Sequence, residues 1–207
     1  MEIDERVQII LDICRDKDVL DVGCIDHVAI MSHNESWLHG KIMKVAKTCL
    51  GLDIVEQEIA KIDPKYNIMF GDAHTVDLQR KFDVIVAGEL IEHLENPGIF
   101  LKNMFKHLKN DGCLVMTTPN PFYPKRLLDI FFTGSTYVLH EHTCWYCDVT
   151  LSQLLSRCGF DKVDIHFTNA SMRFKMLARL PFKFRKRFSS HIVAVAYRKD
   201  NGTEASV

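Results

Sequence analysis

Short, uninterrupted apolar runs recur along this chain, and stretches with the spacing of a helix separate them. Val84, Ile85, Val86 and Ala87 form one such run, which is typical of a strand covered on both faces of a parallel sheet. Similar runs predict strands over residues 19–22, 49–52, 66–70, 83–87, 112–117, 163–167 and 191–197. Apolar residues three and four apart predict helices over residues 7–14, 38–46, 55–61, 99–108 and 151–158. The alternation predicts an α/β fold with a doubly wound, mainly parallel sheet of seven strands.

Length and composition are those of an ordinary globular domain. A chain of 207 residues can bury a full core, and we expect one domain over residues 1–200 with a disordered tail at 201–207. The formal net charge of -1 gives no overall attraction to nucleic acid or to an anionic membrane. The seven cysteines are scattered and odd in number, which favours reduced thiols. Because no apolar run reaches the length of a membrane span, we expect a cytoplasmic protein, peripheral at a membrane if it meets one.

Three acidic residues follow three of the predicted strands. Asp21 closes the first strand just before Gly23, Asp53 closes the second, and Asp72 closes the third. Each acid alone is more typical of a helix cap or a solvated turn than of a ligand site. Ligands of open α/β sheets bind outside the carboxyl ends of the strands, where all three acids fall. Together they favour a nucleoside site, in which Asp53 takes the ribose hydroxyls.

With these motifs the chain resembles class I S-adenosylmethionine-dependent methyltransferases over residues 15–167. The resemblance rests on residues 20–24 (LDVGC), 51–53 (GLD), 71–73 (GDA), 82–97 and 114–120 (LVMTTPN). It is strongest to ubiquinone-type O-methyltransferases, and it implies a Rossmann-like methyltransferase fold with a final antiparallel strand. It also implies the cofactor contacts: the methionine end at Asp21, Gly23 and Cys24, the ribose at Asp53, the adenine at Asp72 and Ala73, and the sulfonium at Gly88 and Glu89.

The first loop departs from the family pattern. Where two more glycines usually follow, this chain has Ile25 and His27, which should narrow the approach to the cofactor carboxylate. His27 either contacts that carboxylate or lies exposed in the loop. Ile25 also takes the second glycine position of a nicotinamide dehydrogenase, which disfavours that class. The altered loop leaves open a non-catalytic nucleoside-binding or scaffold protein with the same fold.

Two carboxylates and an imidazole come directly after the strand at 83–87. If the chain turns helical there, Glu89, Glu92 and His93 share one face. In small-RNA 2′-O-methyltransferases, which the chain also resembles here, such a cluster and a later histidine bind a divalent cation. The resemblance implies a Mg2+ or Mn2+ site formed by Glu89, Glu92, His93 and His142. The alternative is that His93 acts as a general base without metal, or is simply packed. We assign the acceptor proton to His93 and His142, directly or through a metal.

Two insertions of the predicted fold, at residues 121–148 and 170–189, are expected to act as lids. Residues 172–188 carry seven Lys or Arg and no acid, interleaved with Met, Phe and Leu. This pattern fits an anionic membrane surface or a phosphate-bearing acceptor, and it equally fits a solvated loop.

The sequence therefore predicts a methyltransferase that moves a methyl group from S-adenosylmethionine to a hydroxyl of a small molecule, a sugar or a lipid-linked acceptor. RNA, and nitrogen or carbon acceptors, are the alternatives within enzymes. Fold does not decide among them, because function depends on the site.

Overall fold

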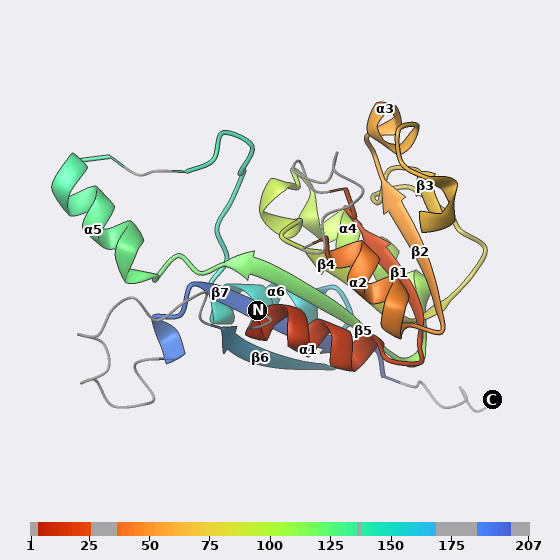
Figure 1. Ribbon diagram of the computed structural model, residues 1–207. Coiled ribbons are helices and arrows are strands. Elements are labelled where there is room, and N and C mark those ends of the chain that lie inside the picture. The colour runs from red at the N-terminus through yellow and green to blue at the C-terminus, as the bar shows by residue number, and fades with distance from the viewer. Residues whose placement is uncertain (1–3, 26–36, 136–137, 169–185, 200–207) are drawn as a thin grey trace, which may run out of the picture.

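The computed structural model describes residues 4–25, 37–135, 138–168 and 186–199, and a seven-stranded sheet forms its centre (Figure 1). The strand order is β3-β2-β1-β4-β5-β7-β6. The strands are β1 (Asp18–Val22), β2 (Thr48–Asp53), β3 (Ile68–Phe70), β4 (Phe82–Gly88), β5 (Leu108–Pro119), β6 (Lys162–Thr168) and β7 (His191–Tyr197). The first five run parallel, and β7 inserts antiparallel between β5 and β6. The predicted fold class and its final antiparallel strand are confirmed.

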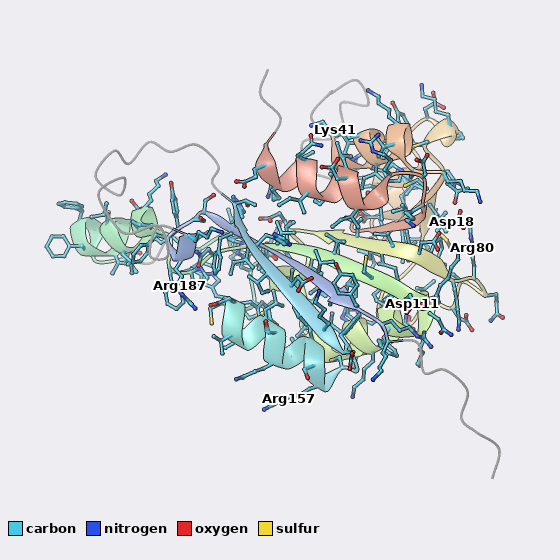
Figure 2. The ribbon with its side chains drawn as sticks, turned by 90° about the horizontal axis from the view of Figure 1, so that it is seen from below. Asp18, Lys41, Arg80, Asp111, Arg157 and Arg187 are labelled. Atoms are coloured by element: carbon cyan, nitrogen blue, oxygen red, sulfur yellow. The ribbon has the colours of Figure 1, made fainter. Side chains whose placement is uncertain are left out.

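Helices cover both faces of the sheet, and Figure 2 shows α1 on one face and α6 on the other. The helices are α1 (Glu5–Cys14), α2 (Leu38–Val45), α3 (Glu56–Ile59), α4 (Pro97–His107), α5 (Pro124–Thr133) and α6 (Asp148–Arg157). Two short 3-10 turns, η1 (Pro64–Tyr66) and η2 (Ile91–His93), complete the described elements. The helix predicted over residues 55–61 is only the single turn of α3.

Side-chain alternation along the central strands divides the core into two clusters. Val84 and Val86 of β4 pack with α1 and α2, whereas Ile85 and Ala87 pack with α4 and α6. All four are at most 2% exposed. Burial on both faces is why the sequence of β4 is a continuous apolar run.

One helix stands apart from this packing. α5 begins after β5 and projects beyond the carboxyl end of that strand, away from the body of the domain (Figures 1 and 2). The chain then returns, and residues 142–144 meet η2. The prediction that the insertion at 121–148 covers an acceptor stays a prediction. Within the described residues, no helix is long and apolar enough to cross a membrane.

Candidate active site

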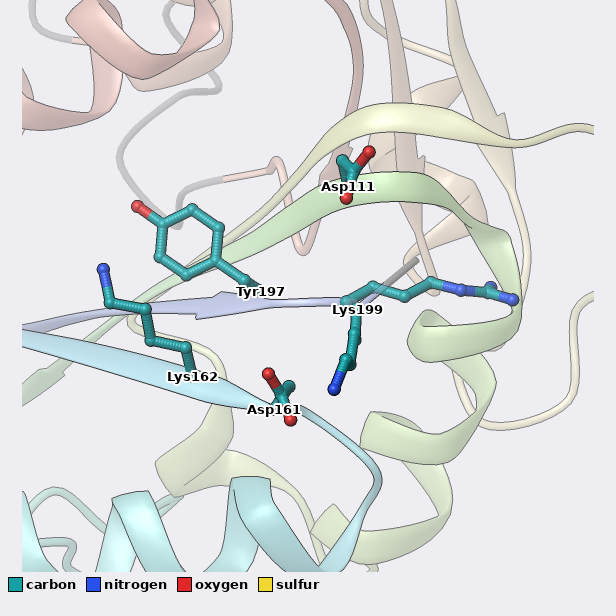
Figure 3. Close-up of a pocket in the computed structure, with 6 residues that line it drawn as sticks. Asp111, Asp161, Lys162, Tyr197 and Lys199 are labelled. Atoms are coloured by element: carbon teal, nitrogen blue, oxygen red, sulfur yellow. The ribbon is translucent and has the colours of Figure 1, made fainter. Parts of the chain in front are cut away.

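Asp21, Asp53 and Asp72, which we call the rim acids, lie at the rim formed by the carboxyl ends of the parallel strands β1, β2 and β3. This rim is where open α/β sheets bind ligands. A surface pocket of about 350 Å³ lies elsewhere, lined by Asp111, Asp161, Lys162, Tyr197, Arg198 and Lys199 (Figure 3). These residues flank the opposite ends of the central strands, so we place the chemistry at the rim and not in this pocket.

Gly23 forms the turn that leaves β1. Its φ of +66° is a left-handed conformation that favours glycine. A Cβ at this position would come within 2.9 Å of Leu90 Cδ1. The Gly23 amide donates to Leu52 O at 2.9 Å, which holds the turn against β2. The local fold therefore requires a glycine at the start of the loop that follows β1, residues 23–25, which we call the cofactor loop because the sequence predicts the cofactor there.

Asp53 connects the cofactor loop to the end of β2. Its Oδ2 accepts from the Ile25 amide at 2.9 Å, and its Oδ1 accepts from the Val55 amide at 3.1 Å. An ionised carboxylate has about four acceptor positions, so two remain for further donors. Two ribose hydroxyls would use those positions. Ile25 thus binds Asp53 through its backbone, which a side chain at this position does not prevent.

Asp72 is held by the turn that follows β3. It accepts from the His74 amide at 2.9 Å and lies 2.8 Å from His74 Nδ1. These hydrogen bonds, the backbone one first, lower the pKa of Asp72. The carbonyl of Ala73 accepts from Asn103 Nδ2 at 3.1 Å, which ties the turn to α4. Both residues predicted at the adenine are therefore rigidly placed at the rim.

Asp21 differs from the other two rim acids because it is sealed from solvent. It is 2% exposed, and His39 Nδ1 lies 2.9 Å from its Oδ2. His39 is fully buried, and its Nε2 lies 2.8 Å from the carbonyl of Tyr66. Burial lowers the pKa of His39, but the hydrogen bond to Asp21 and its charge outweigh burial and the pKa is raised. Burial raises the pKa of Asp21 as well, so both groups hold a proton more readily than they would in water. We infer that Asp21 and His39 share one proton in a buried hydrogen bond beneath the cofactor loop, with Asp21 acting as a structural support.

Glu89 is directed away from the residues that follow it. Its backbone is left-handed, with φ of +50°, and its amide donates to Thr117 O and Oγ1 at 3.1 and 3.0 Å. The carboxylate pairs with Arg6 at 3.0 Å and lies 3.6 Å from His191 Nε2. Only residues 91–93 form a turn, so the single helical face predicted for Glu89, Glu92 and His93 is absent. Glu89 therefore lies outside the candidate metal group.

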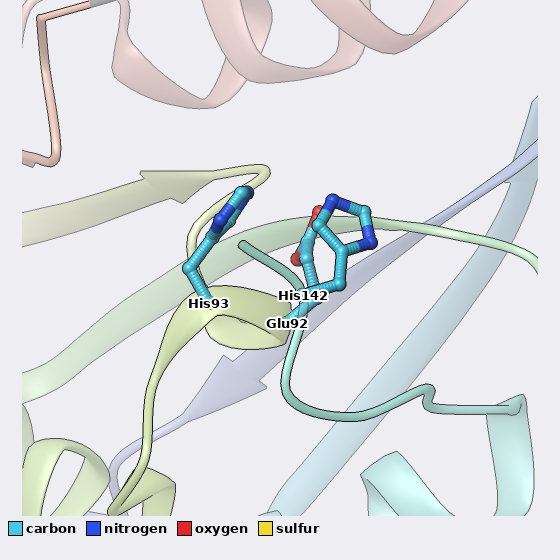
Figure 4. Close-up of side chains that lie close together, drawn as sticks. All are labelled: Glu92, His93 and His142. Atoms are coloured by element: carbon cyan, nitrogen blue, oxygen red, sulfur yellow. The ribbon is translucent and has the colours of Figure 1, made fainter. Parts of the chain in front are cut away.

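Glu92, His93 and His142 do converge, as Figure 4 shows. Each offers one ligand atom, and these atoms lie within 4.8 Å of one another. The two imidazole rings are edge to face, with centroids 4.6 Å apart. The Glu92 carbonyl accepts from the Thr143 amide at 2.8 Å, and this bond brings the histidine from a distant part of the sequence to η2.

The electrostatics of this cluster suit either a proton or a cation. Glu92 is 1% exposed, and burial, followed by the charge of Glu89, raises its pKa to about 8. Burial, followed by the charge of His93, lowers the pKa of His142 and favours a neutral imidazole. Glu92 Oε2 and His142 Nδ1 are buried, and no hydrogen-bond partner reaches either atom from the described part of the chain. Unsatisfied buried polar atoms are costly, and a divalent cation would satisfy both, so the residues fit a metal.

Three of the four predicted metal ligands are thus brought together, and the predicted cofactor residues lie at or beneath the rim. His27 and most of the basic stretch 172–188 lie outside the described residues. Arg6, His39 and His191 were not among the residues predicted from the sequence. Arg6 and His39 lie on helices where charged and polar residues are ordinary, so only their contacts reveal them.

Comparison with protein families matches residues 2–165 to a family described as a methyltransferase domain. The "probable S-adenosylmethionine-dependent methyltransferase" of Mycolicibacterium smegmatis is 29% identical over 157 residues, covering 73% of this chain and 54% of that protein. The mitochondrial ubiquinone biosynthesis O-methyltransferase of Schizosaccharomyces pombe is 29% identical over 118 residues, covering 55% and 42%. The chain therefore spans about half the length of these curated relatives.

A solved structure of similar fold is the N-methyltransferase NodS of Bradyrhizobium japonicum in complex with S-adenosyl-L-homocysteine. The TM-score is 0.60 at 16% identity, with 94% of this chain and 86% of that chain covered. At this identity the likeness establishes the fold alone.

Proposed function

The chain belongs to the methyltransferase-domain family, as its sequence predicts, and from this we propose that it transfers the methyl group of S-adenosylmethionine to a hydroxyl oxygen. The acceptor we propose is a small molecule, a sugar or a lipid-linked compound. The observation that carries the proposal is the cluster of Glu92, His93 and His142 on the rim that also holds Asp53 and Asp72.

Cofactor binding would fall to residues that the rim already holds in place. The free acceptor positions of Asp53 suit the ribose hydroxyls, and the absence of a Cβ at Gly23 lets a ligand approach the backbone. S-adenosylmethionine, when bound, would supply a methyl group on a positively charged sulfur. Gly88 and Glu89, which the resemblance places beside that sulfur, lie at and just after the end of β4, and the Glu89 carboxylate is already paired with Arg6.

Transfer to a hydroxyl requires the loss of one proton from the acceptor. Burial keeps His142 neutral near physiological pH, so it can accept a proton, and His93 lies edge to face against it. The two imidazoles would therefore hold the acceptor oxygen and take up its proton. Catalysis of this type depends mainly on positioning, which the Thr143 contact with Glu92 supports.

Glu92, His93 and His142 would also hold a divalent cation, Mg2+ or Mn2+. Such an ion would lower the pKa of a bound hydroxyl. A carboxylate suits these hard cations, whereas two imidazoles also suit softer metals. The identity of the ion is therefore part of the test.

The direct test uses purified protein, methyl-labelled S-adenosylmethionine, and aqueous and organic cell extracts. We expect a labelled methyl ether with the wild-type protein, and none with His93→Ala or His142→Ala. Both variants should still bind S-adenosylhomocysteine, which separates lost chemistry from lost folding. A labelled N-methyl or C-methyl product would contradict the hydroxyl acceptor. A folded protein that binds neither sulfur nucleoside would contradict methyl transfer altogether and favour the scaffold alternative.

A further inference from the structure

An ordinary surface helix turns its apolar side toward the protein, whereas α5 turns its apolar side toward solvent. Successive helical residues are rotated by about 100°, which places five apolar residues on one side of α5. These residues, which we call the α5 apolar face, are 37–82% exposed: Leu127, Leu128, Ile130, Phe131 and Phe132. The polar side instead approaches the protein, because the Arg126 guanidinium lies 5.2 Å from the centre of the Trp145 ring.

The α5 apolar face is an unusually exposed group of apolar side chains for the surface of a globular domain. Phe131 and Phe132 are 82% and 77% exposed, and their rings pack edge to face at 5.3 Å. No residue of α5 is buried, and Phe122 and Leu139 on either side of the helix are also about half exposed. Contiguous exposed apolar patches mark sites of interaction with a protein or a membrane.

Basic residues lie near the start of α5, and one of them, Arg187, pairs with Asp148 at 2.8 Å. Lys125 lies on the first turn of α5, and Asn120, which precedes the helix, donates through Nδ2 to Arg187 O at 2.9 Å and Ser189 O at 2.7 Å. These bonds fasten the end of the basic stretch 172–188 beside the helix. The stretch carries seven Lys or Arg and no acid.

We propose that the α5 apolar face docks on an anionic lipid bilayer, with the adjacent cations against the lipid headgroups. Apolar side chains beside Lys and Arg are the composition of interfacial membrane anchors. A symmetric contact between two copies would bury the same apolar face of each chain and would offer no anionic group to the adjacent cations. Neither a symmetric dimer nor an apolar cover from this chain would account for the cations. The proposal does not depend on methyl transfer.

Docking would also give the candidate site a defined position. The chain that carries the α5 apolar face continues to His142. The His142 amide donates a hydrogen bond to Leu139 O at 2.9 Å, which holds this part of the chain in a turn next to the candidate site. A bilayer against α5 would place lipid close to the chain that carries His142.

The test is sedimentation of the full chain with vesicles of phosphatidylcholine, with or without phosphatidylglycerol, and without S-adenosylmethionine. We expect binding to anionic vesicles, much weaker binding to neutral ones, and a decrease with salt. Phe131→Ser with Phe132→Ser should lower the partition coefficient at least about tenfold, because two largely exposed aromatic rings lose their burial in lipid. The melting temperature should not change, since neither side chain is buried.

The control variant is Ile99→Ser, which removes a 54% exposed apolar side chain from α4 on the body of the domain and should leave vesicle binding unchanged. Lys125→Gln with Lys186→Gln should weaken binding to anionic vesicles and flatten its salt dependence. Equal binding to neutral and anionic vesicles, or none to either, overturns the proposal. The proposal is also overturned if the wild-type protein is a dimer in sedimentation equilibrium and the double Phe variant is a monomer, because a second copy then covers the α5 apolar face.

Discussion

Adding a single methyl group at Gly23 should damage the cofactor loop in two separable ways. A left-handed backbone costs a non-glycine residue roughly 1–2 kcal/mol. The new Cβ would also lie 2.9 Å from Leu90 Cδ1, and this overpacking adds roughly 1 kcal/mol because the end of a flexible side chain can shift. We therefore expect Gly23→Ala to lower the free energy of unfolding by roughly 2–3 kcal/mol.

The same substitution should lower the affinity for S-adenosylhomocysteine at least about tenfold, equivalent to about 1.4 kcal/mol of binding free energy. The reason is that the new methyl group lies where the ligand approaches the backbone. Urea unfolding and isothermal titration calorimetry measure the two effects. Gly159→Ala is the control: its φ is +105°, and its Cβ would meet Phe105 at an ordinary 3.5 Å. It should destabilise the fold without changing ligand affinity.

A double-mutant cycle with Leu90→Ala separates backbone strain from the steric contact. Leu90→Ala should recover only the overpacking part of the stability loss in Gly23→Ala. Wild-type stability and affinity in Gly23→Ala would refute both the left-handed turn and the placement of the cofactor beside it.

Three further predictions concern the rim and the cluster. S-adenosylhomocysteine should raise the melting temperature, and Asp53→Ala should remove most of that increase; a full increase in the variant would exclude Asp53 as the ribose acceptor. The pKa of His39 is raised by Asp21, so the stability it contributes is complete below about pH 6.5 and is lost as the pH rises through the raised pKa. Unfolding of the wild type should show this loss and that of His39→Gln should not; parallel pH curves would argue against a raised pKa of His39 in the folded protein. Chelation should stop turnover, Mn2+ or Mg2+ should restore it, and Glu92→Gln should weaken Mn2+ binding measured by electron paramagnetic resonance; full activity in chelator would eliminate an essential exchangeable cation.

Local patterns were enough to predict the sheet and most of its rim. The continuous apolar run at Val84–Ala87 predicts a strand buried on both faces, and alternating helical stretches predict parallel neighbours. Asp53 and Asp72 are predicted at one edge because the ends of parallel strands meet there. These inferences succeed because strand burial and crossover connections depend on residues close together in the sequence.

The direction of individual side chains depended on contacts between distant residues. Glu89 lies outside the candidate metal group because its left-handed backbone directs its carboxylate toward Arg6, which is far away in the sequence. His142 lies beside Glu92 because the Glu92 carbonyl accepts a hydrogen bond from the amide of Thr143, about fifty residues later in the sequence. Asp21 and His39 form a buried pair only because α2 packs against β1 and β2. Periodicity carries the preference of each segment for helix or strand, whereas the orientation of a side chain is decided by whichever distant partner reaches it in the folded chain.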